Sequence, residues 1–166
     1  TLFCKPEEEK NSTMNTGLPA AEEPAVTEEV DQFMSGLKAA RIVAGQMTRW
    51  PSDRNESDEI LIKQMNGIIK ELMHARAKVI VYQFPDLILV LQAGVALFRA
   101  TRERAISSQT AAMTAWLNLL DDTAVLVIHT YLFPTDNVTG RAVAYWNEWV
   151  DIASDAPLMV GAEEEE

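Results

Sequence analysis

Few residues in this chain have types and spacings that could support metal or acid–base chemistry. The clearest are Glu71 and His74, a Glu-x-x-His pair that places a carboxylate and an imidazole on one helix face. Two such pairs and two further glutamates make a helical di-iron site. The only other histidine, His129, has a leucine three residues before it. The sequence therefore predicts no metal site and no cofactor, and His74 is expected on a polar helix surface.

The acidic pair Asp121-Asp122 resembles the start of a magnesium-diphosphate motif, but the third carboxylate one turn later is absent. Helix capping explains the pair instead, and predicts that a new helix runs from 124 to 133. Spacing identifies no histidine partner for a serine nucleophile or for the single cysteine, Cys4. No Gly-rich phosphate loop occurs. We therefore predict no catalytic residues and a protein that is not an enzyme, with an uncharacterised enzyme kept as an alternative.

The composition fits a folded chain in a reducing environment. Hydrophobic residues make up 48% of the 166 residues, enough for a sizeable core. A single cysteine excludes a disulfide within the chain, which favours an intracellular or virion-type setting. Glycosylation-type triplets begin at Asn11, Asn55 and Asn137, and such short triplets also arise by chance. No apolar segment typical of a signal peptide occurs in the first thirty residues.

The net charge of −11 is carried by the two ends of the chain. Residues 1–31 hold 2 basic and 8 acidic side chains, and residues 155–166 hold 5 acidic side chains and no basic one. Residues 32–154 hold 12 basic and 12 acidic side chains. We therefore predict a flexible acidic segment at 1–26, a helical domain at 27–154 and an acidic tail at 155–166. Within the domain, residues 38–104 hold 11 basic and 7 acidic side chains, and residues 105–154 hold 1 and 5. Such an asymmetry suits head-to-tail packing of identical copies.

Hydrophobic periodicity predicts helices along the whole domain. Thr27 caps a first helix that stops at Trp50-Pro51, and Ser57 caps a second. The second helix carries a regular apolar seam, typical of lengthwise packing against other helices: Leu61, Met65, Ile68, Leu72, Ala75, Val79 and Tyr82. Its end, residues 78–84, is rich in β-branched residues and could instead be a short strand.

Four helices are predicted beyond the break at Phe84-Pro85-Asp86. Residues 87–98 are apolar nearly all round, which indicates a buried helix too short to span a membrane. A helix then runs from Ser107 or Ser108 to Leu120, before the 124–133 helix described above. Residues 134–140 form a turn cluster, and the last helix lies near 141–153. The predicted fold is all-α, a bundle of about five to six helices.

Two segments resemble known helical families. Residues 136–146, with Gly140-Arg141 at their centre, look like the Gly-Arg segment of Bcl-2-type regulators, in which the arginine meets an aspartate of a partner helix. A second set is similar in order to motifs of coat proteins of rod-shaped plant viruses, which are four-helix subunits that stack around RNA. That set comprises Arg41, Trp50-Pro51, residues 83–86, residues 98–104 and Asp121-Asp122.

The sequence favours a non-enzymatic structural or interaction protein, an α-helical subunit of a larger homo- or hetero-oligomeric assembly with protein partners and self-association. Its candidate interface residues are aromatic, a type enriched at interface centres: Trp116, Tyr145, Trp146 and Trp149. One alternative is a nucleic-acid-coating subunit of the coat-protein type, with phosphate contacts from Arg99, Arg102 and Arg104. A Bcl-2-like regulator is another. No membrane span is predicted.

Overall fold

A computed structural model describes residues 27–49, 58–74, 76, 78–101 and 107–154, and 91% of these residues are helical with no strand among them. The prediction of an all-α bundle of five to six helices is therefore confirmed. The predicted flexible segments 1–26 and 155–166 lie outside the described residues, as do Cys4, Asn11, Asn55, Arg102 and Arg104. The helices are α1 (Glu28–Arg49), α2 (Asp58–His74), α3 (Lys78–Gln83), α4 (Pro85–Thr101), α5 (Ser107–Leu132) and α6 (Gly140–Ser154).

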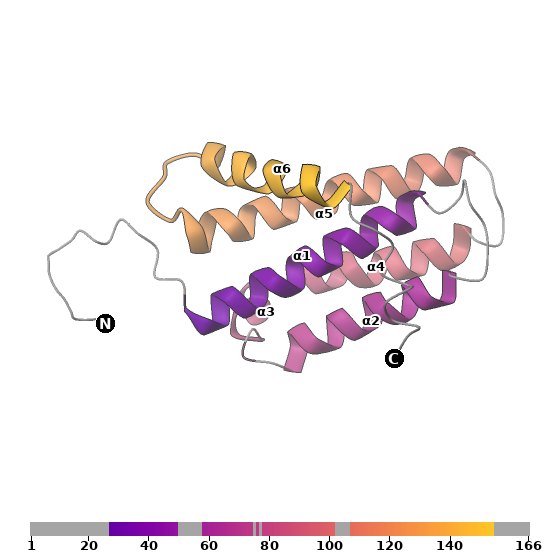
Figure 1. Cartoon of the computed structure of the whole chain (residues 1–166), viewed down its shortest axis with the longest axis horizontal. Helices are drawn as coiled ribbons and strands as arrows, with labels where there is room; N and C mark the ends of the chain where they lie inside the picture. Colours follow the sequence, from indigo (N-terminus) through magenta and orange to yellow (C-terminus); the bar gives the residue numbers. More distant parts are fainter. Residues whose placement is uncertain (1–26, 50–57, 75, 77, 102–106, 155–166) are drawn as a thin grey trace, which may run out of the picture.

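Helix α1 begins where the sequence predicts and lies at the centre of the bundle. The Thr27 hydroxyl accepts a hydrogen bond from the Val30 amide at 3.1 Å, which satisfies one of the free amides of the first turn. Glu28, Glu29 and Asp31 add acidic side chains at the positive end of the helix dipole. Helix α1 packs against α2, α5 and α6, so that α2 lies on one side of it and the α5–α6 pair on the other (Figure 1).

The predicted apolar seam ends earlier than its spacing indicates. Leu61, Met65 and Leu72 are buried along α2, but α2 stops at His74 and a separate short helix, α3, follows it. Val79 and Tyr82 lie on this separate helix, where they are 54% and 74% exposed. Residues 78–83 form a helix and not the alternative short strand. The prediction that the seam continues through Val79 and Tyr82 was wrong, because both side chains are exposed.

Helices α4 and α5 meet where a tryptophan lies against a glycine. Trp116 of α5 is buried, and its indole N–H donates to the Val90 carbonyl of α4 at 2.8 Å. A Cβ on Gly94 would lie 1.9 Å from Cζ2 of Trp116, a distance far inside van der Waals contact. The absence of a side chain at position 94 is what lets the indole reach the α4 backbone.

Helix α5 runs without interruption through Asp121-Asp122, so the prediction that these residues cap a new helix was wrong. The turn predicted at 134–140 does separate α5 from α6, and Asn137 is exposed in it. Among the described residues, Ala111–Leu132 is long and apolar enough to cross a membrane by length and composition alone. The core helix of a soluble protein can pass the same test, and here α5 packs against α1, α4 and α6.

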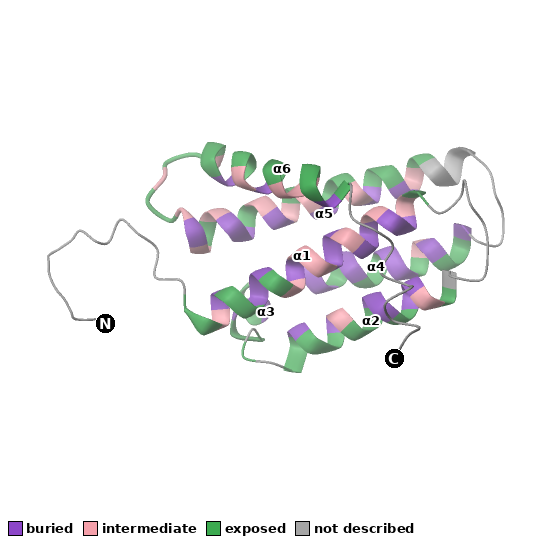
Figure 2. Ribbon diagram, in the orientation of Figure 1, coloured by how far each residue is buried: buried purple, intermediate pink, exposed green. Residues whose placement is uncertain are grey.

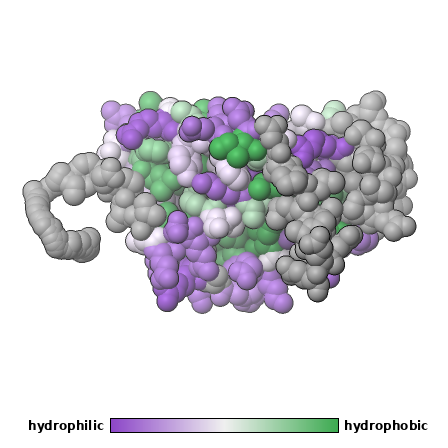
Figure 3. All heavy atoms as spheres, in the orientation of Figure 1, coloured by the Kyte–Doolittle hydropathy of each residue, from purple (hydrophilic) through white to green (hydrophobic). Residues whose placement is uncertain are grey.

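The buried residues of the helices face one shared core, and the outward faces differ in character (Figure 2). Between residues 59 and 74, α2 has eight exposed positions, of which Glu59, Lys63, Lys70 and Glu71 are charged. Between residues 111 and 132, α5 also has eight exposed positions, but Asp122 is the only charged one. Figure 3 shows, for one face, hydrophobic residues gathered in separate patches among hydrophilic ones.

Candidate functional site

Three helices are joined by a network centred on the carboxylate of Asp121 in α5. Arg41 of α1 donates to it twice, from Nε to Oδ1 at 2.7 Å and from Nη2 to Oδ2 at 3.2 Å. The indole N–H of Trp146 in α6 donates to the same Oδ1 at 2.7 Å. Arg41 is 7% exposed and Trp146 is fully buried. The carboxylate, whose side chain is 25% exposed, therefore joins α1, α5 and α6 in a partly buried setting.

Packing and charge pairing within the chain account for this network. A buried guanidinium must be paired, and a two-point contact with a carboxylate provides both charge and geometry. Asp121 already accepts three hydrogen bonds, so it is not positioned as a free acid or base. The sequence contained one signal for the network: Arg41 falls among the apolar residues of α1, between Leu37 and Ala44. Its partner, 80 residues away, could not be read from spacing.

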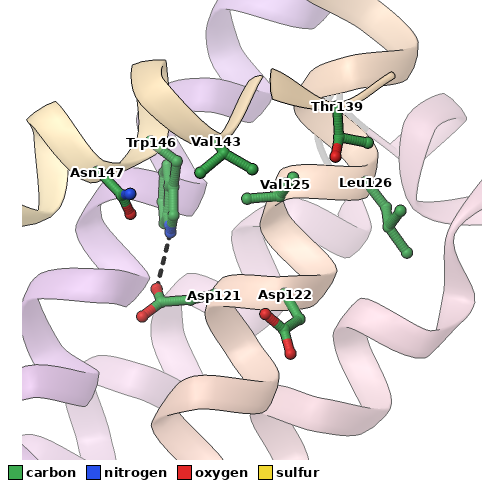
Figure 4. Close-up of a pocket in the computed structure, with 8 residues that line it drawn as sticks. All are labelled: Asp121, Asp122, Val125, Leu126, Thr139, Val143, Trp146 and Asn147. Atoms are coloured by element: carbon green, nitrogen blue, oxygen red, sulfur yellow. Dashed lines mark hydrogen bonds between the residues drawn. The ribbon is translucent and has the colours of Figure 1, made fainter. Parts of the chain in front are cut away.

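A groove lies directly beside the network, between α5 and α6. It has a volume of about 340 Å³, and Figure 4 shows Val125 and Val143 facing each other across it, with Trp146 and its bond to Asp121 at one side. Leu126 is 56% exposed, and Val143 and Asp122 are exposed as well. The lining residues are Asp121, Asp122, Val125, Leu126, Thr139, Val143, Trp146 and Asn147.

The groove presents apolar walls with one exposed carboxylate, that of Asp122. This combination suits a long aliphatic side chain with a cationic end, because the methylene groups can cover the walls while the charge reaches the carboxylate. Its lining contains no histidine, cysteine or lysine. Among the described residues, no group of three or more His, Cys, Asp or Glu side chains is arranged to hold a metal ion.

The predicted interface aromatics lie in two places. Trp116 and Trp146 are core residues, and their indole N–H groups have partners inside the chain. Tyr145 and Trp149 are half-buried on α6, under the ammonium group of Lys38, which is 5.4 Å and 5.3 Å from the two ring centroids. Packing within the chain accounts for Trp116 and Trp146 without a partner, and partner contact by Tyr145 and Trp149 stays a prediction.

The remaining candidates are dispersed over the bundle. Arg99 is exposed in the last turn of α4, and Glu71 and His74 are exposed on α2, as expected for a polar face. Arg141, the arginine of the Bcl-2-like segment, lies 4.6 Å from the centre of the Phe133 ring and 3.4 Å from Asp136. Its cation is therefore engaged by the turn that precedes its own helix.

No family model matches this chain, and comparisons with curated proteins and with solved structures each found no match.

Proposed function

We propose that this chain is a non-enzymatic structural subunit that assembles with further copies of itself. The observation that carries the proposal is the outer face of α5, where one of eight exposed positions is charged while α2 has four of eight. Charged side chains normally cover a helix that faces water, and their depletion is characteristic of interface centres. Exposed Leu119 and Leu126 add apolar area to the same face.

The charge distribution supports an identical copy as the partner. Residues 107–154, which form α5, α6 and the turn between them, hold five acidic residues and one basic residue, Arg141. The described residues between 27 and 101, which form α1 to α4 and include Arg76 between α2 and α3, hold eight basic and seven acidic residues. An acidic, apolar side and a more basic opposite side are complementary between neighbouring copies, and complementary charge guides both partner choice and orientation.

The decisive measurement is the native mass of the full chain by size-exclusion chromatography with light scattering. We expect a multiple of the 18.5 kDa subunit mass, and expect Leu126→Glu to reduce it to a single subunit by placing a charge in the apolar contact. Val79→Glu is the matched control, since Val79 on α3 is equally exposed at 54% and should leave the mass unchanged. A wild-type monomer at high micromolar concentration would contradict self-assembly.

A second candidate function, a nucleic-acid-coating subunit, is favoured by the exposure of Arg99 at the end of α4, next in sequence to Arg102 and Arg104. Phosphate contacts of this kind predict binding to single-stranded RNA that weakens steeply as salt is raised. The triple variant R99A/R102A/R104A should bind more weakly and with a shallower salt dependence, as measured by fluorescence anisotropy. Absence of binding by the wild-type chain at about 50 mM salt would exclude this function.

A further inference from the structure

We infer that the two surfaces joined in the assembly are different: the outer ridge of α2 in one copy docks in the α5–α6 groove of the next. The α2 ridge consists of the exposed residues Lys63, Asn66, Gly67 and Lys70. This inference rests on the proposed self-assembly and specifies which surfaces carry it. Figure 1 shows α2 and the α5–α6 pair on opposite sides of the bundle, separated by α1.

The groove selects for lysine or arginine. Leu126 and Val143 form exposed apolar walls, and the carboxylate of Asp122 lies beside them at the groove surface. A lysine can lay its four methylene groups along such walls while its ammonium group pairs with the carboxylate. A volume of about 340 Å³ holds inserted side chains, whereas a whole helix is about 10–12 Å across and would remain above the groove.

Within the described part of the chain, α2 is the helix that presents two exposed lysines on one face. Lys63 and Lys70 are seven residues apart, which is about two helical turns or about 10 Å. Of the other described cations, Lys78 and Arg99 are each exposed singly, on α3 and on α4, and three more have contacts within the chain. Arg76 pairs with Glu28, Arg141 pairs with Asp136, and Lys38 lies over two aromatic rings.

Gly67 lies between the two lysines and has no explanation within the subunit. A Cβ at this position would meet no heavy atom within 4 Å, so nothing in the same chain needs the space. Glycine in an exposed helix interior costs about 0.5–1 kcal/mol relative to alanine. A neighbouring helix that comes close to the α2 backbone at this point would use the missing side chain.

Because the two surfaces lie on opposite sides of one bundle, each copy uses both. Such a heterologous contact repeats in one direction and closes into a ring or continues as a helical filament, depending on the rotation between neighbours. A two-fold symmetric dimer would instead use one surface twice. The two arrangements therefore respond differently when variants defective in different surfaces are mixed.

The test mixes one variant with an altered α2 ridge and one with an altered groove. Lys63→Glu/Lys70→Glu keeps the groove intact, and Leu126→Glu keeps the ridge intact. Each is expected to be a monomer alone, and an equimolar mixture is expected to form a heterodimer of twice the 18.5 kDa subunit mass and nothing larger, by light scattering or native mass spectrometry. Gly67→Gln provides a second ridge variant that changes no charge and introduces a good helix former. Two single charge reversals provide the control. Lys70→Glu alters the ridge, whereas Lys78→Glu lies outside it and should assemble like the wild type.

The outcomes separate the inference from the proposed function. A monomeric wild-type chain would overturn self-assembly itself. Assembly of the ridge variants at wild-type level would overturn the α2 contact while leaving self-assembly in place. Two monomeric variants that fail to form a heterodimer on mixing would also overturn the inference, because they would point to a surface that is used twice.

Discussion

Replacing Asp121 by alanine is expected to lower the free energy of unfolding by about 3 kcal/mol, the lower end of the range for removing one partner of a buried ion pair, because the Asp121 side chain is 25% exposed. The change leaves the guanidinium of Arg41, which is 7% exposed, without its carboxylate. It also removes the acceptor of the Trp146 indole N–H, which adds the cost of an unsatisfied buried donor. The measurement is urea-induced unfolding followed by circular dichroism, at a concentration low enough for the chain to be monomeric.

Two companion variants identify the cause. Asp122→Ala removes the neighbouring carboxylate, which is exposed, and should change stability by no more than about 0.5 kcal/mol. Arg41→Met/Asp121→Leu removes both charges and should be more stable than Asp121→Ala, because no buried cation is left unpaired. Equal stability of the Asp121→Ala and Asp122→Ala variants would show that the network does not hold the three helices.

Local signals were sufficient to predict most of the helices. Thr27 forms the predicted cap of α1, the turn at 134–140 separates α5 and α6, and the break at Pro85 starts α4. Each of these features depends on residues that lie within one turn of each other, so the sequence pattern carries the necessary information. The apolar 87–98 segment was likewise predicted as a core helix, and α4 contacts α1, α2, α3 and α5.

The errors concern features that are decided by distant residues. Asp121-Asp122 has the composition of a helix start, but the pairing of Asp121 with Arg41 satisfies its charge inside a continuous α5. The apolar seam continues in sequence to Tyr82, while in the structure Tyr82 lies on the separate helix α3 and is exposed. Neither a pairing across 80 residues nor the division of the seam between two helices can be derived from periodicity.

The candidate groove was even less accessible to prediction. Its walls come from two helices, and its two exposed apolar residues, Leu126 and Val143, are unremarkable members of apolar helical patterns. What the sequence did indicate was the acidic character of residues 105–154, which is the side of the bundle that contains the groove. The acidic segment thus coincides with the side of the molecule that contains the groove, and only the packing of α5 against α6 located the groove itself.

Replacing Gly94 by alanine is expected to cost about 1–5 kcal/mol of stability. The added Cβ would lie 1.9 Å and 2.2 Å from Cζ2 and Cε2 of Trp116, so the indole must move. Overpacking a core typically costs about 1–3 kcal/mol, and the displaced indole N–H loses its bond to the Val90 carbonyl, which adds about 1–3 kcal/mol if it stays buried. The higher helix propensity of alanine offsets about 1 kcal/mol of this loss.

The same substitution at Gly67 is the matched control, because that glycine also lies within a helix but faces open space. Gly67→Ala should therefore stabilise the monomer by about 0.5–1 kcal/mol. Urea-induced unfolding of both variants under identical conditions measures the change in the free energy of unfolding, which should be a decrease for Gly94→Ala and an increase for Gly67→Ala. In Gly94→Ala/Trp116→Phe the smaller ring relieves the overlap, so the double variant should lose less stability than the sum of the single changes. Strict additivity would instead show that the cost of Gly94→Ala arises somewhere other than its contact with Trp116.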